Sequence, residues 1–185
     1  DEVKEVLKRI KDLLDELRRH SEKVNRDVER LLEELARNSE KVNREIRRLL
    51  DDLRRLVEEK STDEEVEDEL RRAEKEVEEK NKRHKEELER NRETVKRKNE
   101  KHRDEVRKVE EDVRRTLEKI ERDQLGRDDL ERILREVDKK IKDLKRENER
   151  MLEEVERNAK EHKDRDREEL KRVKEDLDRL RERLR

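Results

Sequence analysis

The sequence of 185 residues has no cysteine, no proline and no aromatic residue, and it has a single glycine. Without cysteine the chain cannot form disulfides or thiolate metal sites, and its redox compartment stays open. It also has no apolar run long enough for a signal peptide or a membrane-spanning helix, so we expect a soluble protein. Lys and Arg number 58 against 60 Asp and Glu, which leaves no basic field to attract nucleic acid or an anionic membrane. We therefore expect neither as a partner.

What the sequence does contain is charge, together with aliphatic side chains at helical spacing. Charged residues make up 64% of the chain and hydrophobic residues 25%, which is typical either of disorder or of long helices. Aliphatic residues recur every three or four positions, and a disordered chain lacks such a stripe. We therefore predict an all-α protein.

An eighteen-residue phrase occurs twice in succession. The segment HSEKVNRDVERLLEELAR at 20–37 is followed by NSEKVNREIRRLLDDLRR at 38–55, and eleven of the eighteen positions are identical. Eighteen residues make five turns of a 3.6-residue helix, so each repeat returns its side chains to the same face without a supercoil. Natural coiled coils usually carry a seven-residue repeat instead. The period predicts straight, untwisted helices.

Two breaks divide the chain into very long helices. Ser61 and Thr62 each have a Glu three residues later, which is the spacing of a capping box. Gly126 stands where a left-handed residue would end a helix, and Asp128 offers the next N-cap. The predicted helices cover residues 1 to about 60, about 63 to 124 and about 129 to 185. Short connections between them favour an antiparallel up-down-up three-helix bundle that forms a single domain over residues 1–185.

Polar residues interrupt the apolar stripe of each helix at matching heights. With tight connections, residue numbers at one height should add to about 123 between the first two helices and to about 250 between the last two. One predicted layer contains His20, Ser21, Asn25, Asn99, His102 and Asn148. The other contains Asn38, Ser39, Asn43, Asn81, His84, Asn91, Asn158, His162 and Asp166. Because an unpaired buried amide or imidazole costs about 1 to 3 kcal/mol, we expect these side chains to hydrogen-bond one another.

Taken together, these features resemble de novo designed helical bundles: the eighteen-residue period, the two short connections, the surface of Glu, Lys and Arg, and the HSEKVN and NSEKVN layers. More narrowly, the chain is similar to designed bundles with buried histidine hydrogen-bond networks that come apart in acid. The resemblance implies a structural protein with no natural activity and no natural partner. It also implies that the pH-sensing residues are His20, His84, His102 and His162, with Asn and Ser partners from the two layers. No motif in the chain calls for a cofactor.

The pH response has a physical basis that can be stated from the sequence. A buried imidazole that takes part in a network must stay neutral, so its pKa should fall below the unfolded value of about 6.5. Acid should then unfold or disassemble the bundle below about pH 6. A carboxylate raises the pKa of a nearby histidine, so Asp166 should weaken the effect at His84 or His162. The layer without Asp166 is expected to be the stronger trigger.

Other interpretations stay open. The histidines could be neutral residues that only fix the helix register. His162 and Asp166 are four residues apart on one face and, with His84, offer three ligands for a divalent ion, although the many Asn residues favour a hydrogen-bond network over a metal site. We expect no enzyme, because no serine has a triad context and no glycine-rich loop is present. A monomer is expected because no apolar residue falls outside the stripes, with a homo-oligomer as the alternative.

Overall fold

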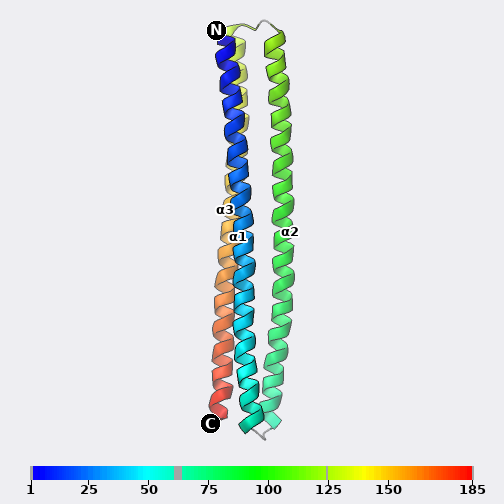
Figure 1. Ribbon diagram of the computed structural model, residues 1–185, viewed down its shortest axis with the longest axis vertical. Coiled ribbons are helices and arrows are strands. Elements are labelled where there is room, and N and C mark those ends of the chain that lie inside the picture. Colours follow the sequence, from blue (N-terminus) through cyan, green and yellow to red (C-terminus); the bar gives the residue numbers. More distant parts are fainter. Residues whose placement is uncertain (1, 61–63, 124, 185) are drawn as a thin grey trace. The chain divides into compact units, whose positions relative to one another are not determined.

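The computed structural model describes residues 2–60, 64–123 and 125–184. It consists of α1 (Glu2–Lys60), α2 (Glu64–Arg122) and α3 (Arg127–Arg183), each an uninterrupted helix (Figure 1). Helix makes up 98% of the structure and the described residues form no strand, so the prediction of an all-α three-helix bundle is confirmed. None of the described helices has an apolar segment that could cross a membrane.

The connection before α3 differs from the prediction. Gly126 does not have a positive φ, so it is not a left-handed cap at the end of α2. Its carbonyl accepts a hydrogen bond from the backbone N–H of Leu130 at 3.1 Å, which places it at the start of α3. Asp128 therefore lies in the first turn of α3 and not at the N-cap. In the first turn its negative charge is close to the positive end of the helix dipole. The predicted capping residues of the first connection lie outside the described residues: Ser61 and Thr62.

The chain divides into two compact units, and each unit draws on all three helices. Unit 1 comprises Asp1–Arg30 and Thr94–Glu156, and unit 2 comprises Leu31–Glu93 and Arg157–Arg185. The buried apolar cluster of unit 1 contains Ile10, Leu13, Leu17, Val106, Val113, Ile120, Leu130, Val137, Ile141 and Leu144. That of unit 2 contains Ile46, Leu50, Leu53, Val57, Val66, Leu70, Val77, Val173, Leu177 and Leu180. Each unit thus buries a core of its own, and the single domain stays a prediction.

Ion pairs define the register of α1 against α2 within each unit. In unit 1, Nε of Arg18 lies 2.9 Å from Oε1 of Glu110. In unit 2, the Arg54 guanidinium donates two hydrogen bonds to the Glu74 carboxylate, at 2.6 and 2.8 Å. The residue numbers add to 128 in both pairs, which shows that the helices are antiparallel and that they are offset by five residues from the predicted sum of about 123.

The register of α2 against α3 agrees more closely with the prediction. Lys98 contacts Glu154 in unit 1 and Arg165 contacts Glu87 in unit 2, so residue numbers at one height add to 252 in both pairs. The predicted sum was about 250. The larger offset between α1 and α2 has a consequence in unit 1, because it brings His102 to the height of Asn25 and not to that of His20.

Candidate functional site

The predicted polar residues follow the buried stripes of the helices with one exception. Those that are buried are Ser21, Ser39, Asn81, Asn99, Asn148, His162 and Asp166. Those that are half-buried are His20, Asn25, Asn38, Asn43, His84, Asn91 and His102. The exception is Asn158, which is exposed and is not part of a buried layer. It lies about 70° from the centre of the buried stripe of α3, so its side chain is directed away from the core.

The clearest polar contacts lie in unit 2, around His84 of α2 and His162 of α3. The two rings meet edge to face, with centroids 5.6 Å apart and an interplanar angle of 72°. Each ring also contacts a polar side chain of the other helix. Nε2 of His84 lies 2.6 Å from Oδ1 of Asp166, and Nδ2 of Asn91 lies 2.6 Å from Nε2 of His162. We call these four side chains the histidine cluster. The sequence predicted His84 and Asp166 at one height with Asn91 and His162 to one side, and the structure brings the four side chains into contact.

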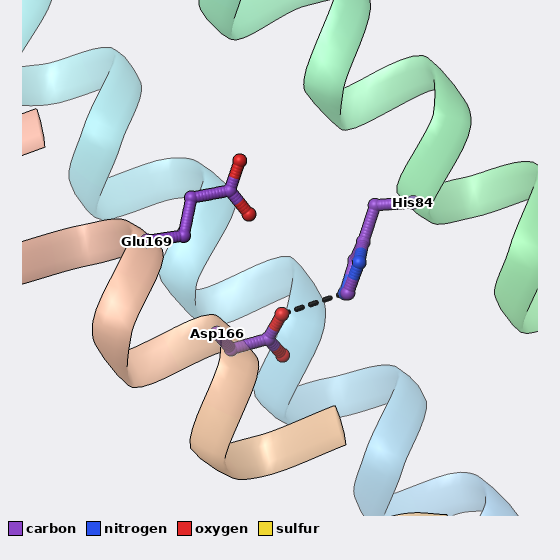
Figure 2. Close-up of side chains that lie close together, drawn as sticks. All are labelled: His84, Asp166 and Glu169. Carbon is purple, nitrogen blue, oxygen red and sulfur yellow. Dashed lines mark ion pairs between the residues drawn. The ribbon is translucent and has the colours of Figure 1, made fainter. Parts of the chain in front are cut away.

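Asp166 provides the charged partner of the histidine cluster. Figure 2 shows its carboxylate pointing from α3 toward the His84 ring on α2. The ring N–H is not directed along the short line between Nε2 and Oδ1, so the contact is an ion pair when the ring is protonated and is not an aligned hydrogen bond. The pKa of His84 is raised, chiefly because its protonated ring can donate to Asp166. Burial opposes this rise, and the negative charges of Glu169 and Glu87 add to it.

The environment of His162 has the opposite effect. Its side chain is buried, with 3% of the residue's surface exposed. The Asn91 amide nitrogen is a donor, so Nε2 of His162 accepts the hydrogen bond and the ring is neutral, with its proton on Nδ1. Burial is the main cause that lowers the pKa of His162. Glu87 opposes this effect, whereas the positive charges of protonated His84 and of Arg165 reinforce it.

The polar residues of unit 1 are not paired in the same way. Four of their atoms are buried without a hydrogen-bond partner: Nε2 of His20, Oδ1 of Asn99, Nδ1 of His102 and Nδ2 of Asn148. In unit 2 the same holds for three atoms of the histidine cluster: Nε2 of His84, Nδ1 of His162 and Oδ2 of Asp166. His102 lies close to carboxylates instead, with Nδ1 at 3.9 Å from Oε2 of Glu105 and with Glu147 nearby. The offset between α1 and α2 accounts for part of this, because it separates His102 from His20 by more than a helical turn.

The sequence did not point to the carboxylates at the edge of the histidine cluster, Glu87 and Glu169. Glu87 follows His84 by three residues, and Glu169 follows Asp166 by three residues, which places each pair on one face of its helix. That spacing was visible in the sequence. It did not discriminate, however, because a chain with 60 acidic residues has a carboxylate three or four positions from almost any residue.

The fold and the site define the chain as an all-α three-helix bundle that carries histidine and carboxylate groups in its interior. Comparison with models of protein families, with curated proteins and with solved structures finds no match to it. The side chains gathered in the two units offer imidazole nitrogens, carboxylates and amides. The chemistry open to these groups is proton binding and metal coordination.

Proposed function

We propose that the chain is a structural three-helix bundle without catalytic activity, whose buried histidines make its stability depend on pH, as in the designed bundles that its sequence resembles. One observation carries this proposal. The Asn91 amide donates a hydrogen bond of 2.6 Å to the neutral ring of His162 in a site that is almost closed to water. The folded protein therefore resists a proton that the unfolded chain accepts.

Protonation of His162 meets three obstacles. A proton on Nε2 sets two donors against each other, so the bond to Asn91 must break or the amide must turn over. The new charge is also buried, and it lies beside His84 and Arg165, which lower its pKa. The two carboxylates that could balance this charge, those of Glu87 and Asp166, already have partners. Glu87 pairs with Arg165 at 3.0 Å, and Asp166 contacts His84 at 2.6 Å.

The two histidines change stability with pH in opposite senses. The folded pKa of His162 lies below the unfolded value of about 6.5, so its contribution is complete above that value and is lost as the pH falls, by at most about 1.4 kcal/mol per pH unit. The folded pKa of His84 lies above the unfolded value, so its contribution is complete below about pH 6.5 and is lost as the pH rises through the folded pKa. Acid destabilisation therefore comes from His162, and His84 offsets part of it.

The test is denaturant unfolding between pH 8 and pH 5, with a chelator present, on the unmodified protein and on His162→Gln. Glutamine does not titrate, and its carbonyl can accept the hydrogen bond from Asn91. We expect the unmodified protein to lose stability as the pH falls through 6.5 and the variant to lose much less.

His84→Gln is the matched control. It removes the histidine whose protonation stabilises the fold, so its stability should fall more steeply with acid than that of the unmodified protein. Equal slopes for the unmodified protein and His162→Gln would show that other groups carry the acid response, and the proposal would be wrong.

A further inference from the structure

One imidazole and two carboxylates converge in unit 2. His84, Asp166 and Glu169 each offer one ligand atom, and these three atoms lie within 4.8 Å of one another. Figure 2 shows Asp166 and Glu169 on successive turns of α3, both directed toward the His84 ring on α2. A spacing of three residues places the two carboxylates on the same face of the helix. Two helices thus present one nitrogen donor and two oxygen donors to a common point.

Two observations distinguish this group from the many carboxylates on the surface. Asp166 is 2% exposed, and its Oδ2 is buried without a hydrogen-bond partner, which is rare for a carboxylate oxygen in a folded protein. The charge is also unbalanced. Asp166, Glu169 and Glu87 all lie near the His84 ring; among the described residues Glu87 pairs with Arg165, whereas Asp166 and Glu169 share the single charge of His84. A divalent cation would supply the missing ligand bond and neutralise the two remaining carboxylates.

We propose that His84, Asp166 and Glu169 form a binding site for a divalent ion of the first transition row, represented by Zn²⁺. One imidazole with two carboxylates suits such an ion, whereas Mg²⁺ and Ca²⁺ prefer oxygen ligands alone. Around tetrahedral Zn²⁺ the ligand atoms lie about 2.0 to 2.2 Å from the ion and therefore about 3.4 Å from one another. The contact between His84 and Asp166 must lengthen from 2.6 Å, and the flexible Glu169 side chain must move inward. Three protein ligands leave the fourth position for water.

The metal site does not depend on the proposed pH response. In the alternative metal site that the sequence left open, His162 was a possible ligand beside His84 and Asp166, but its Nε2 accepts the hydrogen bond from Asn91, and Glu169 is the third member of the converging group. His162→Gln should therefore remove the acid response and leave Zn²⁺ binding unchanged. Protons and metal ions compete for the nitrogen of His84, so binding is measured at pH 7.5.

The experiment is a calorimetric titration of the metal-free, full-length protein with Zn²⁺, with Co²⁺ absorption as a second readout of the coordinating atoms. The variants His84→Gln and Glu169→Gln each remove one ligand, and circular dichroism confirms that they are folded. The matched control is Glu168→Gln, because Glu168 is exposed and is the direct neighbour of Glu169. We expect Zn²⁺ to bind the unmodified protein and to raise its melting temperature. Each ligand variant should bind at least about tenfold more weakly, and the control should bind as the unmodified protein does.

A second variant, His102→Gln, tests the other group with ligand-like spacing, which consists of His102, Glu105 and Glu147 in unit 1. If only this variant loses Zn²⁺, the ion belongs to unit 1 and the proposed site is wrong. It is also wrong if the unmodified protein binds no Zn²⁺, or if both His84→Gln and Glu169→Gln bind as tightly as Glu168→Gln.

Discussion

The rings of His84 and His162 lie edge to face with centroids 5.6 Å apart, and yet their pKa values are shifted in opposite directions. His84 contacts the carboxylate of Asp166, which favours a charged ring. His162 accepts a hydrogen bond from the amide of Asn91, which favours a neutral one. A difference between their immediate partners therefore gives two neighbouring histidines different roles: His84 binds a proton early, and His162 resists one.

The opposite shifts predict two separate titrations. In a pH titration of the metal-free protein followed by NMR of the imidazole resonances, the midpoint of His84 should lie above about 6.5 and that of His162 below it. Asp166→Asn removes the main cause of the rise at His84, so the midpoint of His84 should fall in that variant. Midpoints shifted in the same direction for both rings would contradict the structure.

Asp166→Asn should also change stability in a manner that depends on pH. The ion pair with His84 contributes below about pH 6.5 and is lost as the pH rises through the folded pKa of His84, so the variant should lose more stability at pH 5.5 than at pH 9. A loss of about 1.5 to 3 kcal/mol is expected at pH 5.5, measured by urea unfolding. Asp164→Asn, on the exposed face of the same helix, is the control and should stay within about 0.5 kcal/mol of the unmodified protein. A loss in Asp166→Asn that is the same at both pH values would argue against the ion pair.

One type of substitution should have opposite effects in the two units. Asn91→Leu leaves the buried Nε2 of His162 without its donor and should cost about 1 to 3 kcal/mol. Asn148 is 2% exposed and its Nδ2 has no partner, so Asn148→Leu should raise the free energy of unfolding by about 1 kcal/mol. Urea unfolding at pH 8 measures both changes. Destabilisation by Asn148→Leu would show that its amide is hydrogen-bonded in solution.

The ion pair that defines the register of α1 and α2 in unit 2 should contribute more than a pair within one helix. Arg54 and Glu74 are half-buried and form two hydrogen bonds, so Glu74→Gln should cost about 0.5 to 1 kcal/mol. Glu33 pairs with Arg37 of its own helix at the exposed surface, and Glu33→Gln should change stability by less than about 0.5 kcal/mol. The two variants are compared by urea unfolding at low salt. An equal loss of stability in the two variants would show that the ion pair between helices contributes no more than the pair within one helix.

The fold was predictable because the same helical pattern of apolar residues repeats along the whole sequence. An apolar side chain every three or four residues gives each helix one face that can turn inward, and positions on these stripes such as Leu70 and Ile141 are fully buried. Asn158 shows the limit of that logic, because it lies at the flank of its stripe, where a small change in helix rotation decides whether a side chain is covered. Of the other fourteen predicted polar residues, seven are buried and seven are half-buried.

The site was less predictable, because its chemistry depends on distances of a few ångströms between helices. The sequence did not predict the register of α2 against α1 to within a helical turn, and the offset of five residues decides which groups meet in unit 1. In unit 2 the sequence placed Asp166 near both histidines. Only the structure shows that its carboxylate raises the pKa of His84, while burial lowers that of His162.

The division of the chain into units has a consequence for how the protein can be made and cut. Unit 1 joins a segment at the start of the chain to one that ends at Glu156, and unit 2 needs the final residues 157–185. During synthesis, the contact between Arg54 and Glu74 can form early, because the two residues are only 20 positions apart in the sequence. The contact between Glu16 and Lys145 forms late, because 129 positions separate them. The core of unit 1 cannot close until α3 has been made as far as Leu144, and the core of unit 2 also needs Leu180 near the end of α3. A protease cut in either connection would therefore separate residues of one core from one another in both units.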